Sequence, residues 1–415
     1  MEVLRIATAG SVDDGKSTLI GRLLYETNSI TTDKLEAIQR ASQRKGIGFL
    51  DLSLLTDGLI AEREQGITID VAHIYFSTPR RKFIIADSPG HVEYTRNMIT
   101  GASKADVSII LVDVRNGILE QTHRHYYIAN LLNIPRVIVC VNKMDLADYA
   151  EEPFRKIKED FEEFSSKIKS PHQEIKFIPI SSLNGDNLTA SSDKMPWYEG
   201  APLLEILERM DVHKNETKLP SRFPIQYVVR PRNEEHHDYR GYAGRVASGS
   251  FSVGDSVTVL PSGQKSKIQG IHRYKESLEH AHSRQSVTIT LADDVDISRG
   301  DMIIRTEDLP ELKKDFVSKV CWLNKEPMVS GKSYLLQHGT AYSKAKISTI
   351  EYIQDPATLT KLDGATSLKM NDIAQVQIRS AKSLPIDHYA DNPSNGSFIL
   401  IDEHSNNTVA VGVVC

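Results

Sequence analysis

The sequence predicts an α/β domain with a mostly parallel sheet and helices on both faces, followed by two all-β barrel domains. Three observations lead to this fold class. Apolar runs of strand length alternate with helical patterns over residues 1–212. The first run leads directly into a glycine-rich loop and then a helical pattern. Beyond residue 220, short strand patterns alternate with turn residues instead, which is typical of sandwiches and barrels.

The first 212 residues contain six runs that are long enough to be strands. The runs at 71–76 and 83–87 are joined by a turn at 77–81 that contains Pro79, so we expect them to form an antiparallel hairpin. Helical patterns at 121–132 and 153–168 supply crossovers of the kind that parallel strands require. The predicted strands are Leu4–Ala9, Val71–Phe76, Phe83–Asp87, Val107–Val112, Arg136–Val141 and Ile175–Ile180.

A polar segment that ends at Pro220 separates this domain from the rest of the chain. The following 200 or so residues are enough for two small barrels, with a division near 307–310. We therefore expect three domains: a nucleotide-binding domain at 1–212, a second domain at 218–308 and a third at 311–415.

The composition is that of a soluble globular protein, with 40% hydrophobic and 25% charged residues in 415. A net charge of −5 gives no sign of a nucleic-acid partner, although a local basic patch can hide within an acidic total. The three cysteines are too few and too far apart in the sequence to form a disulfide framework or a zinc knuckle. The sequence shows no signal-peptide pattern and no run of membrane-spanning length, so we expect a cytoplasmic protein without a membrane partner.

The loop after the first strand has the spacing of a phosphate-binding loop, G-x-x-x-x-G-K-S. Its glycines let successive backbone N–H groups face one anion, and the N-terminus of the following helix adds its positive dipole end. Lys16 supplies a positive charge for the outer phosphates, and the Ser17 hydroxyl is placed to bind Mg²⁺. The candidate binding residues are Gly10, Ser11, Val12, Asp13, Asp14, Gly15, Lys16, Ser17 and Thr18.

A D-x-x-G segment follows the strand at 83–87, at the sheet edge where α/β proteins bind ligands. Asp87 can hold a magnesium-bound water there, and Gly90 can offer its backbone N–H to a γ-phosphate. Thr68 can close over Mg²⁺ when that phosphate is present and release it after hydrolysis. The segment supplies the candidates Asp87, Ser88, Pro89, Gly90 and His91.

An N-K-x-D segment follows the strand at 136–141 and fits guanine. The Asp145 carboxylate can accept hydrogen bonds from N1–H and the exocyclic amine, a donor pair that adenine lacks. Asn142 can tie the base-side loops together, and the Lys143 side chain can cover the ring. The next strand ends in a segment whose backbone N–H can reach the guanine O6. These base-side candidates are Asn142, Lys143, Met144, Asp145, Ser181, Ser182 and Leu183.

These five elements in this order predict a protein that binds GTP with Mg²⁺. Together they resemble the translation-factor GTPases, in which two β-barrels follow the nucleotide domain, as in elongation factor Tu. The resemblance spans essentially the whole chain. Two segments narrow it: the loop 10–17, where elongation factors usually read G-H-V-D-[HS]-G-K-[ST], and the segment 238–249, which departs from the elongation-factor pattern. Both are similar to the GTPase subunit of bacterial heterodimeric sulfate adenylyltransferase.

This resemblance implies roles for individual residues. His91 matches the histidine that positions the attacking water, and Val12 with Ile67 matches the apolar gate around it. Lys16 is then the catalytic cation, and Ser17, Thr68 and Asp87 are the Mg²⁺ ligands, directly or through water. Asp13 matches an aspartate associated with a monovalent cation. Asp14 is a departure, because a second carboxylate near phosphates repels them unless it points outward or pairs with a basic group of a partner.

The resemblance also implies an activity. Members of this family couple GTP hydrolysis to adenylyl transfer from ATP onto sulfate, which takes place on a smaller partner subunit. Some members also have a fused adenylylsulfate kinase domain, which we do not expect in this protein. The alternative interpretation is an elongation-factor-like GTPase that delivers aminoacyl-tRNA to the ribosome.

Overall fold

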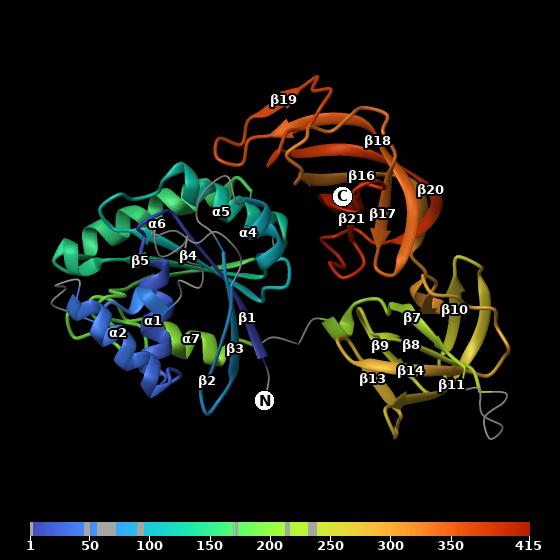
Figure 1. Ribbon diagram of the computed structural model, residues 1–415, viewed down its shortest axis with the longest axis horizontal. Coiled ribbons are helices and arrows are strands. Elements are labelled where there is room, and N and C mark those ends of the chain that lie inside the picture. Colours follow the sequence, from blue (N-terminus) through green and yellow to red (C-terminus); the bar gives the residue numbers. More distant parts are fainter. Residues whose placement is uncertain are drawn as a thin grey trace. The chain divides into compact units, whose positions relative to one another are not determined.

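The computed structural model describes residues 3–44, 50–55, 72–88, 95–168, 170, 173–211, 216–230 and 239–415. The chain divides into two compact units (Figure 1). The first comprises 1–212 with 356–359, and the second comprises 213–355 with 360–415.

A six-stranded sheet forms the centre of the first unit, in the order β2-β3-β1-β4-β5-β6. The pairs β3–β1, β1–β4, β4–β5 and β5–β6 are parallel, and β2–β3 is the predicted antiparallel hairpin. The observed strands are β1 Val3–Gly10, β2 Ala72–Ser77, β3 Lys82–Asp87, β4 Val107–Asp113, β5 Arg136–Asn142 and β6 Glu174–Pro179.

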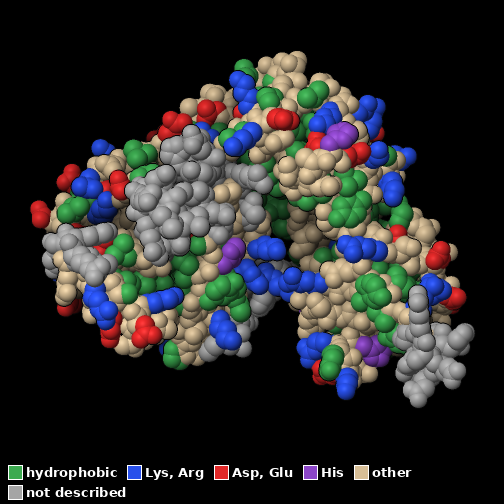
Figure 2. Space-filling view, in the orientation of Figure 1, with side chains coloured by type: hydrophobic (Ala, Val, Ile, Leu, Met, Phe, Trp, Pro, Cys, Tyr) green, Lys and Arg blue, Asp and Glu red, His purple; other side chains and the backbone are tan. Residues whose placement is uncertain are grey.

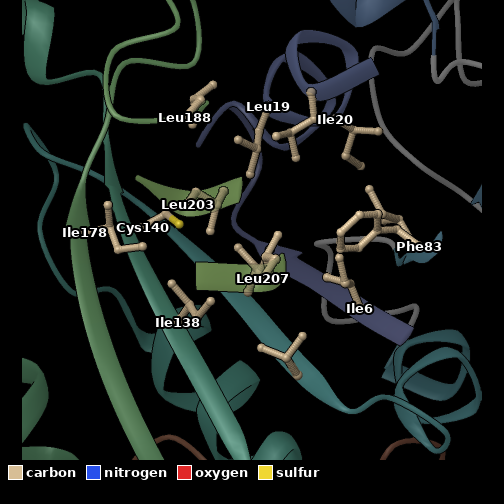
Figure 3. Packing of buried hydrophobic residues seen from close by; sticks show 14 of the residues in the cluster. Ile6, Leu19, Ile20, Phe83, Ile138, Cys140, Ile178, Leu188, Leu203 and Leu207 are labelled. Carbon is tan, nitrogen blue, oxygen red and sulfur yellow. The ribbon is translucent and has the colours of Figure 1, made fainter. Parts of the chain in front are cut away.

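Helices cover both faces of this sheet (Figure 1). On one face, Leu19 and Ile20 of α1 and Leu207 of α7 pack on Ile6 and Ile138 in a continuous apolar core (Figure 3). The helices are α1 Lys16–Glu26, α2 Thr32–Arg44, α4 Thr95–Ala102, α5 Glu120–Leu131, α6 Glu151–Ser166 and α7 Leu203–Arg209, with short 3₁₀ segments η1 Leu52–Leu55 and η3 Met144–Ala147.

Three of these helices were not predicted from the sequence: α2, α4 and α7. The helices α4 and α7 have only eight and seven residues, so each offers too few turns for a clear period. In α2 most residues are polar, and the apolar positions are sparse. The α/β class and the two barrels are nevertheless confirmed.

The second unit contains two closed antiparallel barrels. In the first barrel the strand order β10-β15-β7-β8-β14-β11 closes through pairing of β10 with β11, and β12 extends it. A two-stranded sheet of β9 and β13 accompanies it. The strands are β7 Phe223–Val229, β8 Gly241–Arg245, β9 Ser250–Ser252, β10 Ser256–Leu260, β11 Gln264–Arg273, β12 Glu276–Leu278, β13 His280–His282, β14 Ser286–Leu291 and β15 Met302–Arg305.

The other barrel has the order β17-β21-β22-β16-β20-β18 and closes through pairing of β17 with β18, with β19 as an extension. Closure removes the exposed strand edges that would otherwise invite aggregation. Its strands are β16 Glu311–Trp322, β17 Tyr334–His338, β18 Ala341–Gln354, β19 Lys361–Asp363, β20 Ile373–Ile386, β21 Ser397–Ile401 and β22 Thr408–Val414.

The surface of each unit carries both charge signs. Acidic and basic side chains both occur over the two units on the face shown in Figure 2. Among the described residues, none of the helices has the length and apolar character needed to span a bilayer. Each unit therefore has an apolar core beneath a charged outer surface.

A buried arginine links the two barrels of the second unit. Arg222 is 2% exposed and makes a bidentate ion pair with Asp387, with Nε–Oδ2 and Nη2–Oδ1 distances of 3.0 and 2.9 Å. Its remaining nitrogen, Nη1, donates to the backbone carbonyls of Ser221 and Asp308. Each of the three guanidinium nitrogens is thus hydrogen-bonded, and a buried charge is tolerated when it is paired and hydrogen-bonded in this way.

We expect Arg222→Ala to lower the free energy of unfolding of the barrels by about 3–5 kcal/mol, because it leaves Asp387 without its cation. Arg379→Ala is the control, since Arg379 pairs with Asp315 at an exposed site, and such pairs contribute about 0–1 kcal/mol. Urea unfolding followed by Trp322 fluorescence in a Trp197→Phe background measures both. Equal losses in the two variants would contradict the structural role given to Arg222.

Candidate functional site

The glycine-rich loop connects β1, which ends at Gly10, to α1, which begins at Lys16. Gly15 precedes the helix with φ +90°, a left-handed conformation that side chains disfavour. A Cβ atom at this position would lie 2.4 Å from Asn142 Nδ2. Both the backbone conformation and the space therefore require glycine here.

Lys16 and Asp87 meet at the carboxyl edge of the sheet. The strands β1 and β3 are parallel neighbours, so the loop after β1 and the end of β3 lie at the same edge. Lys16 Nζ lies 2.5 Å from Asp87 Oδ1, and the two side chains are 8% and 1% exposed. Thr8 Oγ1 donates to the same carboxylate oxygen at 3.1 Å. The structure thus brings together two residues that are 71 positions apart in the sequence.

Asp14 points into the protein rather than outward. Its side chain is 2% exposed, and Oδ2 accepts a hydrogen bond from the Ser11 backbone N–H at 2.6 Å. The outward orientation considered from the sequence is therefore wrong, and the pairing with a basic group of a partner stays a prediction. Burial raises the pKa of Asp14 to about 6, and the nearby charge of Asp113 adds to this, while the Ser11 hydrogen bond and the charge of Lys143 oppose it.

Asn142 joins the phosphate loop to the segment after β6. It is 1% exposed at the end of β5. Its Nδ2 donates to the Asp14 carbonyl at 2.7 Å, and its Oδ1 accepts from the Ser182 N–H at 2.9 Å. One amide side chain therefore fixes two loops that are far apart in the sequence.

Lys143 is held by a carboxylate that the sequence reasoning missed. Its Nζ lies 2.9 Å from Oδ2 of Asp113, the last residue of β4. Arg115 donates to the same carboxylate from Nε at 3.0 Å and from Nη2 at 2.6 Å. Burial acts to raise the pKa of Asp113, but the hydrogen bonds from Arg115 and Lys143 outweigh it and lower the pKa to about 2. Its position at the carboxyl end of a buried strand was the available signal.

Asp145 lies in η3, next to the segment after β6. Ser181 Oγ donates to Asp145 Oδ1 at 2.6 Å. On the α1 side, Arg22 Nε donates to the Ser182 carbonyl at 3.3 Å, and Nη2 donates to the Leu183 carbonyl. The base-side candidates are thus tied both to each other and to the helix that follows the phosphate loop.

Other predicted residues lie around the phosphate loop and the ends of β3 and β5. Ser17 and Thr18 lie in the first turn of α1, Val12 is 46% exposed, and Met144 and Ser88 are buried. Asp13 adopts a left-handed φ of 68°. Ile67, Thr68, Pro89, Gly90 and His91 lie outside the described residues.

The donor set suits a triphosphate and a magnesium ion. Hydroxyl and carboxylate oxygens of Ser17 and Asp87 are the ligands that Mg²⁺ prefers, usually together with water and phosphate. Lys16 provides the positive charge beside them. Chemically, this edge of the sheet can bind phosphates, and the Asn142–Asp145 segment can bind a base.

Family models match both ends of the chain. The model described as elongation factor Tu GTP binding domain matches residues 1–215. The model described as GTP-eEF1A C-terminal domain-like matches residues 315–415.

Curated relatives match the whole chain. Sulfate adenylyltransferase subunit 1 of Alteromonas mediterranea is 47% identical over 415 residues, which are 100% of this chain and 87% of that protein. The protein of the same name from Bacteroides thetaiotaomicron is 46% identical, covering 100% and 86%. The bifunctional enzyme CysN/CysC of Mycobacterium tuberculosis is 48% identical over 413 residues, 99% of this chain and 67% of that protein.

We expect Asp14→Asn to stabilise the nucleotide-free protein at pH 8, by roughly 2–3 kcal/mol. A raised pKa means that the unfolded chain ionises first, so the native state loses stability as the pH rises from about 4 through about 6. The neutral amide avoids this loss and can still accept the Ser11 hydrogen bond. The difference between variant and wild type should therefore vanish near pH 4.

Urea unfolding between pH 4 and pH 8 measures this difference. Asp372→Asn is the matched control, because Asp372 accepts a hydrogen bond from a backbone N–H three residues earlier, at 2.7 Å, on an exposed turn. An Asp14→Asn protein that is less stable than wild type at pH 8 would show that the carboxylate stabilises the loop by its charge.

Proposed function

Since the chain belongs to the family of subunit 1 of sulfate adenylyltransferase, with an elongation factor Tu-type GTP-binding domain, we propose that it is the GTPase subunit of a sulfate adenylyltransferase. GTP hydrolysis drives the formation of adenylyl sulfate and pyrophosphate from ATP and sulfate, in sulfate assimilation. The observation that carries this proposal is the 47% identity over the full chain to a protein of that name.

At the phosphate end of the site, the protein must balance the negative charge of the GTP phosphates. Lys16 and Asp87 form an ion pair at this end of the site. The phosphate oxygens of a bound GTP would take the place of Asp87 as partners of Lys16, and Asp87 would then be one of the residues that hold Mg²⁺. A bound Mg²⁺ supplies charge neutralisation at the β- and γ-phosphates. Ser17 and Thr68 would be its other protein ligands.

Hydrolysis requires an oriented water molecule. We assign this role to His91, with Val12 and Ile67 as the apolar gate that restricts the imidazole until the site closes. Lys16 stabilises the negative charge that develops on the phosphate oxygens. The products are GDP and inorganic phosphate.

Guanine is bound at the other end of the site. Asp145 accepts hydrogen bonds from N1–H and the exocyclic amine, and a backbone N–H in the segment 181–183 donates to O6. Lys143 covers the ring while Asp113 holds its ammonium group. Asn142 and Met144 support this loop, and the hydrogen bond from Ser181 orients the Asp145 carboxylate.

Adenylyl transfer belongs to a smaller partner subunit, because the sequence contains only one phosphate-loop motif and its base-side residues fit guanine. The proposed assembly is a heterodimer, cytoplasmic and independent of membranes and nucleic acids. Its three domains are 1–212, 218–308 and 311–415. The elongation-factor alternative is disfavoured, since two relatives that match the full chain at 46% and 47% identity are named sulfate adenylyltransferase subunit 1.

We expect Asp145→Asn to shift the base preference from GTP towards xanthosine triphosphate, whose C2 oxygen matches the new amide donor. The loss for GTP should be about 2–4 kcal/mol, because a donor pair then faces a wrong partner. Competitive titration with GTP, xanthosine triphosphate and ATP measures the shift. Asp148→Asn, three residues further along, is the control and should leave the preference unchanged. Equal binding of GTP and ATP by the wild type would refute the guanine assignment.

We expect the chain to make no adenylyl sulfate from ATP and sulfate alone. Mixed with the smaller subunit, it should give product beyond the ATP-only equilibrium as long as GTP lasts. A non-hydrolysable GTP analogue should abolish this excess, because adenylyl transfer onto sulfate is uphill and needs the coupled hydrolysis. Product yields with GTP, with the analogue and without guanine nucleotide are compared. Identical yields, together with tight binding of aminoacyl-tRNA, would instead support the elongation-factor alternative.

A further inference from the structure

The loop that carries Asp145 begins and ends in unfavourable backbone conformations. Lys143 has φ 64°, and Asp148 and Tyr149 have φ 50° and 58°. Three non-glycine residues with left-handed φ within seven positions are unusual, and such conformations persist only where surrounding contacts hold them. Several of the contacts that hold the second turn are made by Tyr149.

The Tyr149 hydroxyl makes three hydrogen bonds. It donates to Asp186 Oδ2 at 3.0 Å and accepts from Asn184 Nδ2 at 3.1 Å and from Lys194 Nζ at 3.0 Å. The backbone is fixed as well, because Trp197 Nε1 donates to the Tyr149 carbonyl at 2.9 Å. One donated and two accepted bonds use the full capacity of a phenol oxygen.

The partners of Tyr149 lead back to the other base-side segment. Asn184 donates its backbone N–H to Ser181 Oγ at 3.3 Å, and the Ser181 N–H donates to the Asp186 carbonyl at 3.2 Å. Ser181 Oγ in turn donates to Asp145 Oδ1 at 2.6 Å. The hydrogen bonds therefore form a closed ring from Asp145 through Ser181 and the 184–186 turn to Tyr149, which is four residues beyond Asp145.

We propose that Tyr149 is a positioning residue for guanine recognition, which fixes the spacing between Asp145 and the segment 181–183. This inference rests on the proposed function. The two groups that read guanine, the carboxylate and a backbone N–H, come from different loops, so their spacing must match the width of one base edge. Tyr149 connects the ends of both loops through one oxygen atom. It touches no base itself and acts through Asp145.

The test is Tyr149→Phe, which removes only the hydroxyl. We expect it to weaken GTP binding about tenfold but inosine triphosphate binding only about twofold, because hypoxanthine lacks the exocyclic amine and uses fewer of the spaced contacts. Discrimination between the two nucleotides should thus fall about fivefold. Tyr75→Phe is the matched control, since Tyr75 is 68% exposed on β2, and it should change neither affinity. Equal weakening for both nucleotides, or none, would overturn the inference.

A double-mutant cycle shows whether Tyr149 acts through Asp145. In an Asp145→Ala background, Tyr149→Phe should no longer change the ratio of GTP to inosine triphosphate affinity. A full, additive effect in that background would overturn the positioning role. Failure of the guanine assignment, the part of the proposed function on which this inference rests, gives a different result, because the wild type would then not prefer GTP to ATP. If the wild type prefers GTP to ATP and Tyr149→Phe still discriminates between GTP and inosine triphosphate as the wild type does, only the inference about Tyr149 is contradicted.

Discussion

The candidate site depends most on one buried amide, the side chain of Asn142. It accepts a backbone hydrogen bond from the segment after β6 and donates one to the phosphate loop, at 2.9 and 2.7 Å. The phosphate loop passes so close to it that Gly15 has no room for a side chain. Because each partner is a buried backbone group, removing the amide would leave both unsatisfied, at about 1–3 kcal/mol each. The phosphate loop and the base-side segments, the two halves of the site, are thus held together by this side chain.

The lysine charges of the site are balanced by carboxylates. Each of the two lysines is held by a carboxylate from the end of a neighbouring strand, Lys16 by Asp87 and Lys143 by Asp113. Asp14 is the exception, because its carboxylate faces a backbone N–H and its pKa is raised to about 6. Stability is therefore lost at this position at neutral pH, as is common at functional sites.

Much of the fold and the positions of the motifs could be predicted from the sequence. Buried parallel strands can be recognised in the sequence as short apolar runs. A motif that follows such a run lies at the carboxyl edge of the sheet, where α/β proteins bind ligands. That reasoning placed Lys16, Asp87 and Asn142 at the same edge, where the structure describes them. The orientation of Asp14 was missed because burial depends on how distant strands pack around the loop.

The contacts that position the motif residues could not be read from the sequence. Asp113, Tyr149 and Arg222 belong to no motif, and each has one partner far away in the sequence, at separations of 30, 37 and 165 positions. Short helices such as α7 gave no clear period. Such features emerge only when the chain is folded, since a hydrogen bond between distant residues leaves no local pattern.

The most direct test of the account is the affinity of Asn142→Ala for GTP, measured by titration of the nucleotide-free protein. If the amide joins the phosphate loop and the base-side segment into one site, the affinity should fall about tenfold to a hundredfold, with a folded protein retained. Inorganic triphosphate, which reports on the phosphate loop alone, should also bind more weakly. Affinities within about twofold of the wild type for both ligands would contradict the claim that the two halves depend on this interaction.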